Sequence, residues 1–205
     1  MVLKPGFLKR DRFGNILDAR STVTLISGND LNIIVDTGTH EDKQDILCSL
    51  KAIGLVPEDI NILINTHSHP DHSGNNDLFV VAKFIGHKKE YWGLIAQDSC
   101  EIIRKDTEIA PKITVLETPG HTIGSISVFL TGEISNLPST AIAITGDALP
   151  ILDNYLKWVP PGINFDPNIA LQSMNKIVTI ADIVIPGHDA AFRILDRVQR
   201  KAQYV

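Results

Sequence analysis

The stretch His67-Ser68-His69-Pro70-Asp71-His72 holds three of the seven histidines of the chain within six residues. It follows a short run of Ile and Leu at residues 61–65, which we expect to form a buried strand. Side chains two residues apart on an extended chain point the same way, so His67 and His69 can reach one metal ion. Pro70 suits the first position of a helical turn, which would aim Asp71 and His72 at a second point nearby. Imidazole and carboxylate groups together are suited to zinc, iron or manganese.

Three further ligand candidates lie in loops next to expected strands. His121 follows Gly120, His188 follows Gly187, and Asp147 comes directly after an apolar strand-like run. Loops at strand ends are the usual place for a site on a rigid scaffold. We expect each of the two glycines to adopt an unusual backbone angle just before its histidine.

This ordered set of residues resembles the metallo-β-lactamase superfamily, whose hallmark is an HxHxDH loop followed by a lone His, a lone Asp and a lone His. The upstream segment Val35-Asp36-Thr37-Gly38 resembles the Asp-Gly turn of the superfamily. The resemblance covers about residues 20 to 195, and in detail the chain is most similar to the small proteins grouped with metallo-β-lactamase domain-containing protein 1. It implies an αββα four-layer sandwich, in which two mixed sheets carry helices on their outer faces.

The same resemblance implies a dinuclear centre of two divalent metal ions, with zinc expected and iron or manganese as alternatives. It assigns His67, His69 and His121 to the first metal, Asp71, His72 and His188 to the second, and Asp147 to a bridge between them. Asp71 and Asp147 are the expected catalytic residues. Asp36 is expected to hold the histidine loop by hydrogen bonds without touching a metal.

The implied activity is hydrolysis of a small ester, lactone or thioester by a metal-bound hydroxide. Two alternatives remain open on the same ligand set: a phosphodiesterase or ribonuclease, and a mononuclear-iron persulfide dioxygenase. The acyl-homoserine lactonases of the superfamily often place a tyrosine three residues after the bridging aspartate. That position is Pro150 here, so Tyr155 would have to substitute.

Composition places the chain among ordinary globular proteins. It has 205 residues, 43% hydrophobic residues, and 24 acidic against 19 basic side chains, which give a net charge of −5. We expect one domain over residues 1–205. We expect a small-molecule substrate, since the acidic charge balance does not favour nucleic acid as the partner. No apolar run approaches the roughly 20 residues that cross a membrane, and the two cysteines, far apart, suit a reducing cytoplasm. The oligomeric state stays open.

The region around residues 149–166 is the expected wall of a substrate pocket. It is rich in Pro, Gly and aromatic residues, and it begins just after Asp147. Tyr155, Trp158, Phe165 and, from the Asp36 turn, His40 are the candidate pocket residues. The alternatives for this region are core filling or a subunit contact. His87 is expected to be structural or solvated.

The remaining pattern predicts strands and helices that interleave, with hairpins between some of the strands. Strands are expected at residues 22–27, 32–36, 61–65, 79–85, 112–117, 125–130, 140–145, 182–185 and 192–195. Helices are expected at residues 42–53, 88–97 and 168–180. Mixed sheets with helices on their outer faces follow from this order.

Overall fold

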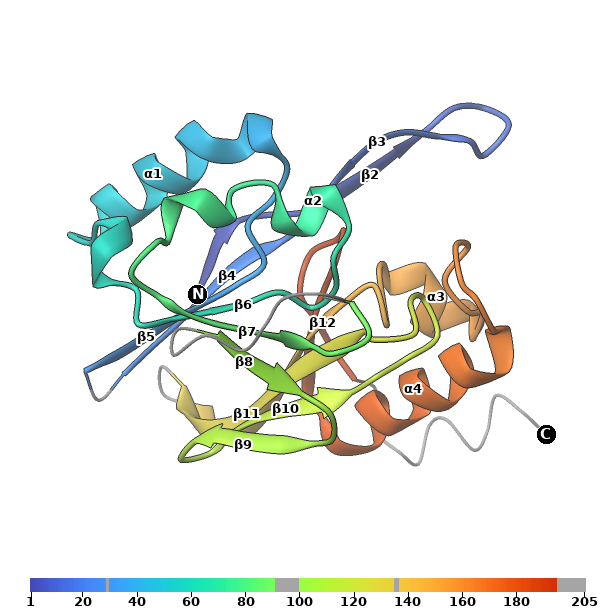
Figure 1. Cartoon of the computed structure of the whole chain (residues 1–205). Helices are drawn as coiled ribbons and strands as arrows, with labels where there is room; N and C mark the ends of the chain where they lie inside the picture. Colours follow the sequence, from blue (N-terminus) through green and yellow to red (C-terminus); the bar gives the residue numbers. More distant parts are fainter. Residues whose placement is uncertain (29, 91–99, 135–136, 195–205) are drawn as a thin grey trace.

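The computed structural model describes residues 1–28, 30–90, 100–134 and 137–194 (Figure 1). Two six-stranded sheets form the centre of the fold. The first sheet has the order β1-β4-β5-β6-β7-β8, with antiparallel pairs at its β1 end and parallel pairs from β5 to β8. Its strands are β1 (Val2–Lys4), β4 (Val23–Gly28), β5 (Leu31–Val35), β6 (Ile62–Ile64), β7 (Lys83–His87) and β8 (Cys100–Ile103).

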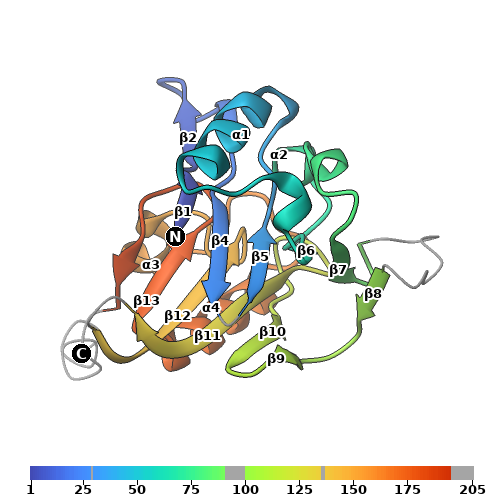
Figure 2. The same ribbon diagram turned by 90° about the vertical axis from the view of Figure 1, so that its left-hand side faces the viewer.

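The second sheet has the order β14-β13-β12-β11-β10-β9 and is also mixed, since only β12 and β13 run parallel. Its strands are β9 (Thr107–Ala110), β10 (Ile113–Glu117), β11 (Ile126–Ile134), β12 (Leu137–Gly146), β13 (Ile183–Pro186) and β14 (Phe192–Arg193). A separate hairpin of β2 (Phe7–Arg10) and β3 (Ile16–Arg20) projects from the body of the fold (Figures 1 and 2).

Helices cover the outer face of each sheet (Figures 1 and 2). The α-helices are α1 (Lys43–Ala52), α2 (Pro70–Ser73), α3 (Leu152–Lys157) and α4 (Pro167–Ile180), and the short 3₁₀ turns are η1 (His40–Asp42), η2 (Pro57–Asp59) and η3 (Asn76–Leu78). Helix α1 packs on the first sheet, and α3 and α4 pack on the second. The predicted four-layer sandwich is therefore confirmed. No helix in the described ranges is long and apolar enough to cross a membrane.

Strict alternation along the strands builds the layers. On β5, Ile33 and Val35 enter the cluster between the sheets, whereas Ile34 faces the helical side. On β12, Ile142 and Ile144 face inward and Ala143 faces α4. Strands buried on both faces are therefore apolar at successive positions, which is why the sequence shows short continuous runs of Val, Ile and Leu.

One expected element differs in the structure, and several observed elements were not predicted. The expected strand at residues 79–85 starts only at Lys83, because Phe79 and Ala82 form a turn that packs on the helical side of the first sheet. The strands before residue 22, as well as β8 and β9, were not expected from the sequence pattern. Helix α3, inside the region 149–166 that is the expected pocket wall, was not expected either. The expected helix at residues 88–97 lies mostly outside the described residues.

Candidate metal centre

The ligand candidates gather at one edge of the sandwich, in loops that follow strands of both sheets. The loop after β6 carries His67 and His69, and α2 continues from it. The loop after β10 carries His121. Asp147 directly follows β12, and His188 lies two residues after β13. Because the strands fix where each loop starts, residues from position 67 to position 188 meet in one place.

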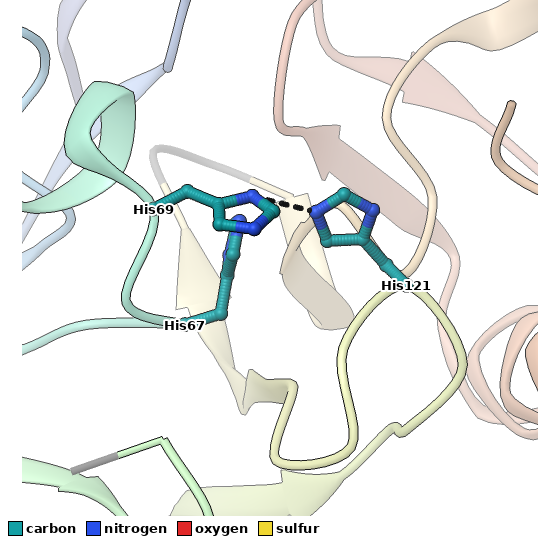
Figure 3. A group of neighbouring side chains, drawn as sticks. All are labelled: His67, His69 and His121. Carbon is teal, nitrogen blue, oxygen red and sulfur yellow. Dashed lines mark hydrogen bonds between the residues drawn. The ribbon is translucent and has the colours of Figure 1, made fainter. Parts of the chain in front are cut away.

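His67, His69 and His121 form the first group of candidate ligands (Figure 3). One ring nitrogen from each lies within 4.8 Å of the others. The Nδ1 of His69 is 3.0 Å from the Nε2 of His121, and the rings of His67 and His69 meet edge to face. His67 is fully buried, whereas His69 is partly exposed. The extended backbone before α2 puts the two histidines of the loop on the same side, as their spacing requires.

Asp71, His72 and His188 form a second group, whose ligand atoms also lie within 4.8 Å of one another. Helix α2 starts at Pro70 and has His69 as its N-cap, so the chain turns between the two groups. The Oδ2 of Asp71 is 3.5 Å from the Nε2 of His188 and 3.8 Å from that of His72.

Asp147 lies between the two groups. Its Oδ1 is 3.3 Å from the Nε2 of His72 and 3.1 Å from the Nε2 of His188. Its Oδ2 faces the other way and is 3.5 Å from the Nε2 of His121. With His67 and His72 it completes a third set of ligand atoms within 4.8 Å. One carboxylate therefore spans both histidine groups.

Outward hydrogen bonds determine which nitrogen of each ring faces inward. The Nδ1–H of His121 donates to the carbonyl of Ile163 (2.7 Å), and that of His188 donates to the carbonyl of Arg20 (2.9 Å). The Nδ1 of His72 lies 2.7 Å from the Oδ2 of Asp36. In the neutral rings this leaves the Nε2 lone pair of each histidine directed into the site.

The spacing of these inward-facing atoms shows whether the residues suit a metal. The Nε2 atoms of His72 and His188 are 3.4 Å apart, and both face the same oxygen of Asp147. Two lone pairs and a carboxylate that converge at such distances repel one another unless positive charge sits among them. Nitrogen and carboxylate ligands with fixed outer hydrogen bonds are the set that zinc and similar divalent ions take. The residues present therefore fit a divalent metal.

The electrostatics of the protein alone agree with this arrangement. Burial lowers the pKa of His72, but the carboxylates of Asp36 and Asp147 outweigh it and raise the pKa well above its usual value. The pKa of His188 is also raised, because Asp147 outweighs the effect of burial. Burial would raise the pKa of Asp147, but His72 and His188 hold that pKa well below its usual value. By contrast, burial and the neighbouring imidazoles lower the pKa of His67, so this ring stays neutral.

The two glycines before the lone histidines serve different purposes. Gly120 has φ +140°, a conformation that other residues rarely adopt, as expected. The same expectation is wrong for Gly187, whose φ is not positive. There a Cβ atom would collide with the Oδ1 of Asp147, so the requirement is room beside the carboxylate.

The expected pocket residues separate into two kinds. Tyr155 is buried in the cluster between α3, α4 and the second sheet, where it stacks on Phe192 (centroids 5.5 Å apart), and Trp158 packs against the same cluster. Both side chains therefore contribute to the core of this layer, as in the core-filling alternative, and a role for them in a substrate pocket stays a prediction. Phe165 is 47% exposed, and its N–H donates to the carbonyl of Gly120 beside His121. His40 is exposed at the start of η1.

Two kinds of contact near the histidines were not predicted from the sequence. The carbonyls of Arg20 and Ile163 hold ligand candidates, but backbone acceptors have no sequence signal. The carboxylate of Glu90 accepts hydrogen bonds from Ser68, which lies between His67 and His69. Glu90 is 22 residues from Ser68 in the sequence, so no local pattern indicates this contact. His87, outside both ligand groups, is buried, and its Nε2–H donates to Glu117 (2.9 Å), so of the two expected alternatives it is structural and not solvated.

Comparison with known proteins supports the family suggested by the motif. The sequence model described as "Metallo-beta-lactamase superfamily" matches residues 18–91. A protein of Methanocaldococcus jannaschii named as a probable metallo-hydrolase is 39% identical over 157 residues, which are 77% of this chain and 70% of that protein. Metallo-beta-lactamase domain-containing protein 1 of Xenopus laevis is 32% identical over 205 residues, with 98% of this chain and 84% of that protein covered.

Lactonases also resemble the chain. N-acyl homoserine lactonase AiiA of Bacillus thuringiensis subsp. kurstaki is 31% identical over 166 residues, which are 74% of this chain and 64% of that protein. A solved structure of an AiiA variant with N-decanoyl-L-homoserine at its active site matches with a TM-score of 0.69 and 26% identity, covering 92% of this chain and 86% of that one. The family predicted from the sequence is confirmed. This chain belongs to the metallo-β-lactamase superfamily and is one of its hydrolases.

Proposed function

We propose that the chain hydrolyses a small ester, lactone or thioester at a dinuclear metal centre. His67, His69 and His121 would hold the first ion, and Asp71, His72 and His188 the second, with Asp147 bridging them. The observation that carries the dinuclear proposal is the position of Asp147. Its Oδ1 faces His72 and His188, and its Oδ2 faces His121. A carboxylate with one oxygen toward each ligand group is placed to bind two ions at once.

Zinc is the ion that we propose, because five imidazoles and two carboxylates suit it well. Iron and manganese accept the same ligands, so the ligand types alone do not exclude them. Zinc needs no redox partner and serves hydrolysis directly. When bound, such ions supply Lewis acidity and make water acidic enough to act as a nucleophile near neutral pH.

The protein's own groups would then position the reaction and move its protons. Asp71 has a side chain that is 22% exposed, more than that of Asp147, so substrate and solvent can reach it. Its Oδ2 lies 3.5 Å from the Nε2 of His188. We assign to Asp71 the transfer of a proton to the leaving group, and to Asp147 the fixed orientation of both ligand groups. Asp36 keeps His72 in one tautomer through their 2.7 Å contact.

Apolar side chains near His121 support an uncharged substrate with an apolar part. Ile123, Ile163 and Phe165 are 52%, 58% and 47% exposed. Ile163 and Phe165 bond through their backbones to His121 and Gly120, which places this apolar rim beside the first group of ligands. The carbonyl of Arg20 contacts His188, but its guanidinium pairs with carboxylates of the protein, those of Asp18, Glu41 and Asp42. This positive charge is therefore already neutralised by the protein and does not favour an anionic substrate. The lactonase relatives act on a substrate of this uncharged class.

Metal analysis followed by a substrate panel on the same sample tests this proposal. Protein purified without added metal should contain two zinc ions per chain and hydrolyse a lactone or a thioester, but not a bis-phosphodiester. Cleavage of the bis-phosphodiester alone would replace the proposal with a phosphodiesterase or ribonuclease. A single iron per chain with persulfide oxidation would overturn both the dinuclear centre and the hydrolysis.

A further inference from the structure

Glu90 lies outside the ligand groups but joins the two loops of the first group. It follows β7 by three residues. Its Oε2 accepts hydrogen bonds from the backbone N–H (3.1 Å) and the hydroxyl (2.8 Å) of Ser68, and its Oε1 accepts one from the N–H of Gly124 (2.9 Å). Ser68 separates His67 from His69, and Gly124 lies in the loop after His121. The carboxylate therefore links the segments that carry all three histidines.

A second link between the loops lies on the other side of His67. There the N–H of Ile126 donates directly to the carbonyl of Thr66 (2.9 Å). The loops are thus fixed at Thr66 by the backbone and at Ser68 by Glu90. Between these two points the position of His67 relative to the His121 loop is set.

The surroundings of Gly124 leave room for the carboxylate and for little else. A Cβ atom at Gly124 would lie 2.7 Å from the Nδ1 of His87 and 2.8 Å from the Cγ of Glu90. The His87 ring cannot yield easily, because its Nε2–H donates to Glu117 and its Nδ1 accepts the N–H of Lys89. A side chain at position 124 would therefore displace Glu90.

The charge state of Glu90 matches its contacts. Burial would raise its pKa, but hydrogen bonds from Thr122, Ser68 and Gly124 outweigh burial and lower it, so the group is ionised at neutral pH. An ionised carboxylate only accepts hydrogen bonds, and every contact just described is made with a donor. Charge-assisted bonds of this kind are about twice as strong as neutral ones.

We propose that Glu90 is a positioning residue that fixes the separation between the His67–His69 segment and the His121 loop and thereby sets the metal affinity of the three-histidine group. This inference rests on the proposed function, which makes those histidines ligands. It predicts a selective effect. His72 and His188 are held by other partners, Asp36 and the carbonyl of Arg20, so the second group should respond little.

Stepwise zinc binding to the full chain, measured by competition with a chromophoric chelator, tests the inference. Glu90→Gln keeps the size of the side chain but turns an amide N–H₂ toward Ser68 or Gly124, each of which is itself a donor there. The step that disappears in His121→Ala identifies the three-histidine group. In Glu90→Gln the affinity of that step should fall about 10–100-fold, the range typical of outer partners of metal ligands, while the other step stays unchanged. Glu58→Gln, on the exposed turn η2, is the matched control and should not alter either step.

The other possible outcomes distinguish a failure of the proposed function from a failure of the role assigned to Glu90. If the wild-type chain binds no zinc, the proposed function fails. If the wild type binds two ions and Glu90→Gln matches it, or if both steps weaken equally along with the thermal midpoint, the role of Glu90 is overturned and the function stands. Should Glu90→Gln not fold, Ser68→Ala removes only the hydroxyl bond. It should weaken the same step by about 2–10-fold, the worth of one hydrogen bond, and no change there would also overturn the inference.

Discussion

The Nδ1 of His72 lies 2.7 Å from the Oδ2 of Asp36, and both side chains are buried. The same carboxylate accepts the N–H and the hydroxyl of Thr66, both at 2.8 Å. Asp36 itself has φ +58°, a left-handed conformation that Asp tolerates better than most residues. One residue at the end of β5 therefore holds the start of the histidine loop and orients a ligand candidate six residues further along.

Asp36→Asn should weaken metal binding while it preserves the shape of the side chain. The amide loses the charge that favours the Nδ1–H tautomer of His72, so the Nε2 atom is a poorer ligand. We expect the zinc affinity of the second group to fall about 10–100-fold in a chelator competition, as for other outer partners of metal ligands. Asp45→Asn, on the exposed face of α1, is the control. Equal affinities in the wild type and in Asp36→Asn would show that Asp36 only supports the loop.

Asp147→Ala should abolish metal occupancy and hydrolysis together. It removes the carboxylate that faces both ligand groups, so each ion loses a ligand and its neutralising charge. The far-ultraviolet circular dichroism should match that of the wild type, because the side chain packs in none of the apolar clusters that hold the layers together. Turnover at the wild-type rate in this variant would remove Asp147 from the mechanism.

Metal removal should lower the thermal stability of the chain. A ligand at about 100 times its dissociation constant stabilises the folded state by about 2.7 kcal/mol. For a chain of this length that corresponds to about 5–10 °C in the melting midpoint. Differential scanning calorimetry before and after dialysis against a chelator measures the shift, and added zinc should reverse it. A midpoint that does not respond to either treatment would contradict the proposed metal centre.

The stability contributed by Glu90 should depend on pH in the acid range. Its pKa in the folded protein is below 4.5, so the unfolded chain takes up the proton first as the pH falls. Its contribution is therefore present above about pH 4.5 and is lost as the pH falls through the folded pKa. Urea unfolding of metal-free protein from pH 6 to pH 3 should show the wild type and Glu90→Gln converging. A difference that stays constant over this range would show that the ionised form is not the one that binds Ser68 and Gly124.

The sequence identified the side chains that meet at the centre, because their pattern is dense and ordered. The histidine loop and the three lone residues follow apolar runs, and the strands bring them to one edge as strand-end loops do. The sequence pattern does not specify in which direction a side chain points once its strand has ended. Tyr155 follows Asp147 closely in sequence, but α3 turns its ring into the core beside Phe192.

Elements with weak patterns were missed for a different reason. Strands β2 and β3 bury little, so their sequences lack the apolar alternation that marks a strand. Glu90 was missed because it is an ordinary charged residue until the fold brings Ser68 and Gly124 to it. Interactions of this kind depend on three separate segments at once, and no local spacing encodes them.

The anchoring of His188 has a consequence for biosynthesis. Its ring is held by the carbonyl of Arg20, and the carbonyl of the preceding Gly187 accepts the N–H and the hydroxyl of Thr22. The second group of ligand candidates therefore depends on contacts between residues that lie 165 positions apart, Thr22 and Gly187. During synthesis, His67, His69 and His121 are added to the chain well before His188. The second ion that we propose would therefore bind only after His188 has been added and its ring has met the carbonyl of Arg20.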